Sequence, residues 1–206
     1  MSRILIVRHG HVEGIHPERF RGRMDVQLDA LGRRQAAATA TRIAAGWEVA
    51  SIYTSPLARA VETGRAIAQA TGAPARGLDD LNDLDYGDWQ WKTNEEVRAA
   101  SPVLFDRWFA FPQQVRFPGG ESLQDLVART ADAVRFALET HPRQTVVMVG
   151  HDAVNRAILI QFLDQPISAY WRLAQSPCAI NEIEVENGRA RVVRVNDTAH
   201  LETIDP

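Results

Sequence analysis

Two short apolar runs, each followed by a histidine, constrain the fold of this chain more than any other feature of its sequence. Residues 4–7 lead into Arg8-His9-Gly10, and residues 145–149 lead into Gly150-His151. Each run is too short for a helix and rich in branched side chains, which is typical of a strand buried on both faces. Ligands of open α/β sheets bind beyond the carboxyl ends of the strands, and we expect the two histidines to lie there.

The rest of the chain alternates helical and strand patterns, which predicts an α/β fold. Four helices are expected: residues 31–45, with a start near Asp29; 55 to about 71; 122–140; and one that begins near 152. A strand is expected over 52–54. Residues 181–185 and 190–195 alternate in polarity and flank Asn187-Gly188, a pair that favours a type I′ turn. This hairpin is expected to close one edge of the sheet.

The composition bounds the class of protein. The chain has 206 residues, of which 45% are hydrophobic and 24% charged, with a formal net charge of -3, so we expect one globular domain over 1–206. Because there is no basic excess, no nucleic-acid partner is predicted, and phosphate chemistry would need a local cluster of cations. The single Cys178 excludes an intrachain disulfide and thiolate zinc sites. No apolar run fits a signal peptide or a membrane span, so the expected location is cytoplasmic.

Several polar residues are placed to join the two histidines. Arg59 follows Ser55-Pro56, at a helix start whose free N–H groups and dipole favour an anion. An ion pair of Arg59 with Glu62 on the helix surface is an equally good interpretation. The loop of 11–28 carries Arg19 and Arg21, either of which could return over His9, whereas Arg23 is better read as solvated.

A carboxylate-rich stretch follows the second strand and helix. Asp83, Asp85 and Asp88 lie beside Trp89, and burial against aromatic rings would raise the pKa of a carboxyl and suit it to donate a proton. The alternative is that these residues cap turns, the commonest use of Asp. Residues 88–118 add further aromatic residues, which could form core or a lid over a pocket, and core is the better interpretation for at least half of them.

This inventory suits phosphoryl transfer without a metal ion. A phosphoryl group in transit spreads negative charge over three oxygens, and catalysis consists largely of positioning and neutralising that charge. Arginine does both, since its planar fork bonds two oxygens and stays charged. Taken alone, Arg8-His9-Gly10 favours a structural histidine, but Arg59, His151 and the carboxylates together reverse that preference.

The motifs, taken in order, closely resemble those of the histidine phosphatase superfamily, the phosphoglycerate-mutase-like proteins. The matching residues run from 4 to 156 and comprise Leu5-Ile6-Val7-Arg8-His9-Gly10, then Arg19, Gly22, Asp25, Leu28, Gly32 and Gln35, then Ser55-Pro56-Leu57 with Arg59, Ala60, Glu62 and Thr63, then Leu81, Asp83, Gly87 and Trp89, then Gly119-Gly120-Glu121-Ser122 and Gly150-His151. The resemblance implies a three-layer α/β/α sandwich around a mixed, mainly parallel sheet.

The resemblance also implies the site. His9 would be the nucleophile that becomes phosphohistidine, and Asp83 the general acid and then base. Arg8, Arg59 and His151 would hold the phosphoryl group, with no metal or other cofactor. Substrate contacts are expected from a second set: Arg19, Arg21, Gly10, Glu121 and Asp152. Glu121 could also orient His9 or Arg59.

Some positions depart from the family pattern. His11, Val12 and Ile15 stand where the family usually has Glu, Thr and Asn, so a phosphate-binding hydroxyl and amide are missing. Asp83 replaces the usual Glu, so Asp85 and Asp88 stay alternatives for the acid. Asp152 follows His151, where it could hydrogen-bond the ring and keep it protonated.

Three functions are compatible with these features. The first is a phosphatase for a small phosphorylated metabolite. The second is a phosphoglycerate mutase, which in this family carries a longer basic insertion than residues 88–118 provide; these residues are aromatic and suit a partly apolar leaving group. The third is a catalytically weak phosphate-binding protein. A homodimer is compatible with the sequence, which does not identify the substrate.

Overall fold

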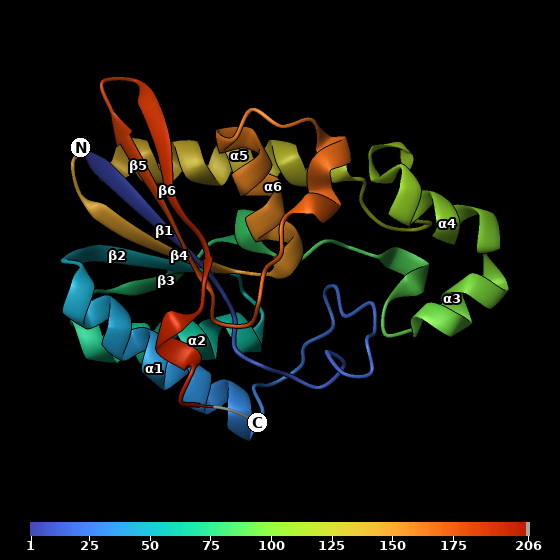
Figure 1. Ribbon diagram of the computed structural model, residues 1–206, viewed down its shortest axis with the longest axis horizontal. Coiled ribbons are helices and arrows are strands. Elements are labelled where there is room, and N and C mark those ends of the chain that lie inside the picture. The colour runs from blue at the N-terminus through green and yellow to red at the C-terminus, as the bar shows by residue number, and fades with distance from the viewer. Residues whose placement is uncertain (205–206) are drawn as a thin grey trace.

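The fold is a six-stranded sheet with helices on both faces, seen here in a computed structural model that describes residues 1–204 (Figure 1). The strands lie in the order β3-β2-β4-β1-β5-β6. In chain order they are β1 Ser2–Arg8, β2 Val49–Thr54, β3 Ala75–Gly77, β4 Thr145–Gly150, β5 Ile180–Glu186 and β6 Arg189–Asp197. The predicted fold class, a three-layer sandwich with a mixed and mainly parallel sheet, is confirmed.

Strands β1 to β4 are parallel, and the antiparallel hairpin of β5 and β6 extends the sheet beside β1. Asn187 and Gly188 both adopt positive φ, of 50° and 73°, as a type I′ turn requires. The expected hairpin is therefore confirmed, with β6 at the edge of the sheet. Sequence patterns did not reveal β3, which has only three exposed residues.

Alternate residues of the parallel strands enter two separate cores. Leu5 and Val7 face α1 (Ala30–Gly46) and α2 (Ala58–Thr71), whereas Ile4 and Ile6 face α5 (Leu123–Thr140) and α6 (Asp152–Phe162). Figure 1 shows these helix pairs on opposite sides of the sheet. Burial on both faces explains why β1 and β4 are continuous apolar runs rather than alternating ones.

The expected helix boundaries follow local capping chemistry. Asp29 caps α1 by accepting from the backbone N–H of Gly32 at 2.8 Å, and Gly72 ends α2 in the left-handed conformation. Ser122 caps α5 in a capping box with Asp125. Each of these ends was predicted within two or three residues, because the capping residues are visible in the sequence.

The aromatic segment of 88–118 forms two short helices, α3 (Asn94–Ala100) and α4 (Pro102–Ala110), which lie beyond one end of the sheet in Figure 1. Phe105, Trp108 and Phe117 are buried, and Phe109 and Phe111 are exposed. Most of these rings are therefore core, as the sequence favoured, but Trp108 and Phe109 also line a pocket beside His9. Among the described residues, no helix is both long and apolar enough to span a membrane.

Candidate active site

The parallel register brings the two histidines together. Arg8 of β1 pairs with Gly150 of β4, and the backbone N–H of His9 donates to the Gly150 carbonyl at 3.0 Å. The rings of His9 and His151 then meet edge to face, with centroids 5.1 Å apart, and both side chains are almost completely buried. The placement of both residues at one sheet edge, which the sequence predicted, is a direct consequence of strand pairing.

The hydrogen bonds of His9 fix its tautomer. Nδ1 lies 2.7 Å from the Gly10 carbonyl oxygen, which can only accept, so Nδ1 carries the proton. Nε2 accepts a hydrogen bond from Nε of Arg59 at 3.2 Å. Burial, and then the charges of Arg59 and Arg8, hold the pKa of His9 well below its ordinary value of 6.5. The ring is therefore neutral, with its lone pair on Nε2 directed into the arginine cluster.

Arg59 is fully buried and reaches the centre of the site from the first turn of α2. Its guanidinium donates to the carbonyls of Met24 and Gly22, both at 2.7 Å, and to Oδ2 of Asp83 at 3.1 Å. These contacts exclude the alternative surface pair with Glu62, which instead bonds Arg33. These bonds fix the cation between His9 and Asp83.

Side chains bond two backbone N–H groups at the start of α2. The first backbone N–H of the helix, on Ala58, donates to Oδ1 of Asp25 at 2.8 Å. The N–H of Leu57 lies 3.3 Å from the hydroxyl of Ser55. These two N–H groups are therefore not available to an anion, contrary to the expectation that the groups at this helix start are free.

Two further arginines complete the cationic cluster. Arg8 is buried and donates through Nη1 to the Gln175 carbonyl, while its Nε has no partner among the described residues. Arg21 donates to the Gly14 carbonyl and lines the pocket together with His9. The charge of Arg21 lowers the pKa of both His9 and Arg8. Of the three arginines in the loop of 11–28, Arg21 therefore has the clearest electrostatic influence on His9.

Asp83 is the carboxylate of the acidic stretch that reaches the histidines. It is 7% exposed, and its Oδ2 contacts Nδ1 of His151 at 3.5 Å in addition to Arg59. Burial raises the pKa of Asp83 above its ordinary value, against the opposing pull of Arg59 and Arg21. Asp85 instead pairs with Arg23, and Asp88 is exposed, so the geometry favours Asp83 over both alternatives.

The expectation that Asp152 hydrogen-bonds the ring of His151 and keeps it protonated is wrong. Oδ1 of Asp152 pairs with Nε of Arg156 at 3.0 Å, one helical turn along α6. The pKa of His151 is held well below its ordinary value by burial first and then by Arg59, so the ring is neutral. Its Nε2 lies 2.7 Å from the hydroxyl of Ser55, a contact that sequence reasoning missed because Ser55 was read only as a helix start.

Two predicted substrate contacts have other partners. The N–H of Gly10 donates to the hydroxyl of Thr63 at 3.2 Å, and a Cβ at this position would lie 2.5 Å from the Gly32 carbonyl oxygen. Gly10 is therefore required for close packing of two backbones. Glu121 bonds Arg23, Arg129 and the N–H of Asp85, and its contacts include neither His9 nor Arg59. The suggestion that it orients those residues was wrong. Arg23 is exposed, as expected, and its guanidinium also pairs with Asp85 and Glu121.

A pocket opens beside His9 and Asp83, and its walls combine aromatic and charged side chains. The pocket also contains Arg19 and Asp152, two of the predicted substrate contacts. The guanidinium of Arg19 donates to the Trp91 carbonyl at 2.8 Å and lies over that ring. The remaining lining residues are Glu18, Phe20, Arg21, Gly22, Tyr86, Asn94, Trp108, Phe109, Ala153 and Trp171. Within residues 1–204, no three His, Cys, Asp or Glu side chains are grouped to hold a metal ion.

Comparison with protein families identifies one match over nearly the whole chain. Residues 4–198 match the model of the histidine phosphatase superfamily (branch 1). Phosphoserine phosphatase 1 of Hydrogenobacter thermophilus is 31% identical over 201 residues, covering 98% of this chain and 95% of that protein. The metal-independent phosphoserine phosphatase of Arabidopsis thaliana is 28% identical over 206 residues, covering 99% of this chain and 85% of that protein.

Comparison with solved structures agrees with the sequence matches. Bacillus stearothermophilus YhfR has a TM-score of 0.93 at 29% identity and covers 98% of this chain and 100% of that one. A mycobacterial glucosyl-3-phosphoglycerate phosphatase has a TM-score of 0.86 at 26% identity, with coverages of 95% and 99%. Three of these four relatives are phosphatases by name, and they support neither the mutase nor the weak phosphate-binding alternative.

Proposed function

The chain belongs to the histidine phosphatase superfamily and is a phosphatase that works through a histidine intermediate, and from this premise we propose that His9 is the nucleophile and Asp83 the proton donor. One observation carries the assignment. The unprotonated Nε2 of a neutral, buried His9 lies within an arginine cluster, beside a buried carboxyl whose pKa is raised.

In the first step, Nε2 of His9 attacks the phosphorus of a phosphomonoester, and the bond from phosphorus to the leaving oxygen breaks. Arg59 must release its hydrogen bond to Nε2 and turn its donors to the phosphoryl oxygens. Arg8 and Arg21 neutralise the remaining charge, and we infer that this cluster replaces the metal ion that many phosphatases use.

Asp83 supports both halves of the reaction. In its protonated form it gives its proton to the departing oxygen, and as a carboxylate it then takes a proton from water, which attacks the phosphohistidine and releases phosphate. A raised pKa favours the protonated form that the first half needs. Nδ1 of the neutral His151 lies 3.5 Å from Oδ2 of Asp83 and makes no hydrogen bond among the described residues. With Nε2 accepting from the Ser55 hydroxyl, Nδ1 carries the proton and can donate it to a phosphoryl oxygen.

The pocket suggests the class of small metabolite. Its aromatic wall, which includes Trp108 and Trp171, suits an apolar stem close to the phosphate. Arg19 can receive a carboxylate, while Glu18 and Asp152 can receive an ammonium group. O-phosphoserine carries both charges, and two relatives are named phosphoserine phosphatases, so we propose it as the first candidate substrate.

A matched panel of phosphomonoesters tests this proposal. We expect the highest kcat/KM for O-phosphoserine, and lower values for phosphoethanolamine and phosphoglycolate, each of which lacks one of the two charges. Arg19→Gln should weaken selection for the carboxylate without affecting an aryl phosphate. Equal kcat/KM values for all three substrates would refute the assignment of substrate, though not that of His9.

The location and the oligomeric state of the protein stay predictions. The cytoplasm is the expected location, and a homodimer is compatible with the sequence. Sedimentation of the purified protein would decide the second.

A further inference from the structure

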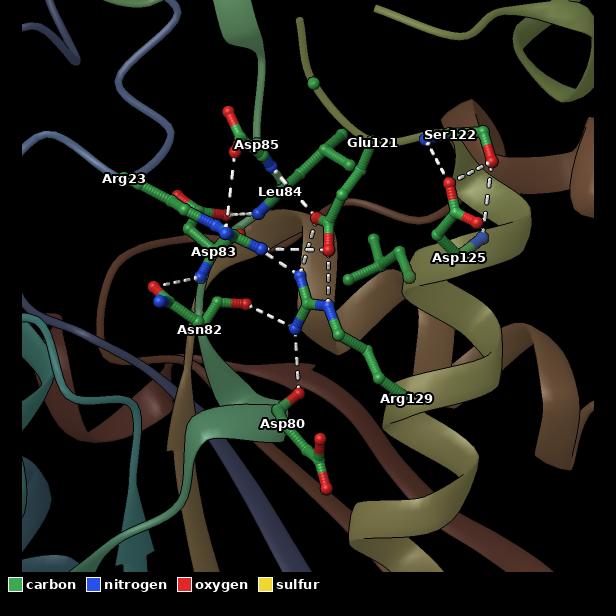
Figure 2. Close-up of polar contacts among 12 residues, drawn as sticks. Arg23, Asp80, Asn82, Asp83, Leu84, Asp85, Glu121, Ser122, Asp125 and Arg129 are labelled. Atoms are coloured by element: carbon green, nitrogen blue, oxygen red, sulfur yellow. Dashed lines mark hydrogen bonds and ion pairs between the residues drawn. The ribbon is translucent and has the colours of Figure 1, made fainter.

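Arg129 of α5 is absent from every motif discussed above, yet it makes several hydrogen bonds to residues 80–85, here called the acid stretch. Its side chain is 15% exposed. Nη1 donates to the carbonyl oxygens of Asp80 and Asn82 at 2.8 and 2.6 Å, and Nη2 donates to that of Asp83 at 3.0 Å. Figure 2 shows the guanidinium lying against this stretch of backbone.

Glu121 completes the arrangement. Its two oxygens accept from Nε and Nη2 of Arg129, both at 3.0 Å, and Oε2 also accepts from the backbone N–H of Asp85 at 3.0 Å (Figure 2). The carboxylate therefore touches the acid stretch on one side of Asp83 while the arginine holds the other. Arg23 adds a third contact, through Nη2 to Oε1 of Glu121 at 2.9 Å.

These bonds use all five N–H groups of Arg129, so the side chain has no donor left for a substrate. Its fixed planar fork meets three carbonyl oxygens and a carboxylate simultaneously. A lysine, with three donors on one nitrogen, cannot reproduce that pattern. What Arg129 determines is therefore the path of the backbone from Asp80 to Asp83.

We propose that Arg129, held by Glu121, is a positioning residue that sets the reach of the Asp83 carboxyl toward the leaving oxygen of the substrate. The proposal rests on the function assigned above to Asp83.

The reach of the Asp83 carboxyl depends on the position of its backbone. An aspartate has one methylene fewer than the glutamate usual in this family, so it cannot correct an error in backbone position by extending its side chain. From Asn82 to Tyr86 the chain forms neither helix nor strand, and no ladder of hydrogen bonds fixes it. Arg129 and Glu121 supply the hydrogen bonds that regular structure supplies elsewhere.

The test measures how activity depends on the leaving group. A proton from Asp83 matters for an alkyl phosphate, whose leaving oxygen is strongly basic, and hardly for 2,4-dinitrophenyl phosphate, whose leaving oxygen is not. For Arg129→Gln we expect kcat/KM to fall by about 10- to 100-fold with O-phosphoserine or another alkyl phosphate, and by less than about 3-fold with the dinitrophenyl ester. Glu121→Gln should give a smaller loss with the same pattern.

The same helix offers a matched control. Arg135 forms an exposed pair with Asp132, so Arg135→Gln removes the same charge from α5 without touching the acid stretch, and both substrates should be turned over as in the wild type. If Arg129→Gln does not fold, Arg129→Lys and Glu121→Gln carry the test. Equal losses on both substrates, or no loss on either, would overturn the proposal.

The variant Asp83→Asn distinguishes the positioning role of Arg129 from the proposal that Asp83 is the proton donor. If Asp83 is the acid, that variant loses activity selectively on alkyl phosphates, and the double variant Asp83→Asn with Arg129→Gln loses little more. If Asp83→Asn shows no such selectivity, the assignment of the acid fails irrespective of Arg129. If Asp83→Asn is selective while Arg129→Gln is not, only the positioning role fails.

Discussion

The two halves of this active site are held in place by different means. His9 and His151 follow strands β1 and β4, and Arg59 lies in the first turn of a helix, so backbone ladders position the groups around the phosphate. Asp83 lies in a stretch without regular structure, positioned by the side chains of Arg129 and Glu121. The first half should therefore tolerate changes in surrounding side chains, and the second should depend on the side chains that bond this stretch, above all Arg129 and Glu121.

The largest effect should come from the nucleophile. His9→Ala removes the proposed nucleophile, and we expect kcat/KM to fall by about 10⁴-fold or more with every substrate, whatever the leaving group. A panel of alkyl and aryl phosphates measures this. Turnover of an aryl phosphate by the purified variant at wild-type rates would refute the assignment of His9.

Asp83→Asn should have the next largest effect. We expect a loss of about 10²- to 10³-fold for alkyl phosphates and much less for 2,4-dinitrophenyl phosphate. Because the pKa of Asp83 is raised, the protonated acid persists to higher pH than an ordinary carboxyl, and its loss forms the alkaline limb of kcat/KM. That limb should disappear in the variant, and a limb that persists unchanged would contradict the role of Asp83.

Gly10→Ala perturbs the strand-end half without touching a charged group. The new Cβ would lie 2.5 Å from the Gly32 carbonyl oxygen, and we expect the free energy of unfolding to fall by about 1–3 kcal/mol. Gly46→Ala is the control, since a Cβ there meets nothing within 4 Å. Urea denaturation compares the two. Equal stability of both variants would show that the contact between these backbones is not required.

The smallest effect should be on the pH dependence of stability. His9 and His151 have lowered pKa values, so below pH 6.5 the unfolded chain binds protons that the folded chain does not, and stability falls as pH falls. The raised pKa of Asp83 acts with the opposite sign. Urea midpoints at several pH values should decline less steeply toward acid in His9→Ala than in the wild type, and an unchanged slope would contradict the burial of a neutral His9.

The contrast between the halves also decides what the sequence could predict. Strand-end residues such as His9 and His151 are visible because an apolar run and a glycine mark the place where a strand stops. Arg59 is marked in the same way by a helix start. Backbone geometry then brings these residues together, so their proximity can be predicted from the fold class.

The positions of Arg129, Arg23 and Ser55 were not predictable in this way. Each acts through a contact with a segment that is distant in sequence. Arg129 and Asp83 are 46 residues apart, and Ser55 and His151 are 96 residues apart. Arg129 belongs to a helix whose apolar stripe is its only periodic signal. The partner of Glu121 could likewise not be named from a short motif, and the expected link to His9 was wrong.

The proposed intermediate is a covalent bond between phosphorus and Nε2 of His9. Because Nδ1 carries the proton that bonds the Gly10 carbonyl, while Nε2 accepts from Arg59, Nε2 is the atom that we expect to attack phosphorus. The direct measurement is a rapid alkaline quench during turnover, followed by peptide mapping and phosphorus NMR of the trapped phosphohistidine. We expect phosphate on the peptide containing His9, attached at Nε2. Phosphate attached at Nδ1, or trapped on any other residue, would contradict this expectation.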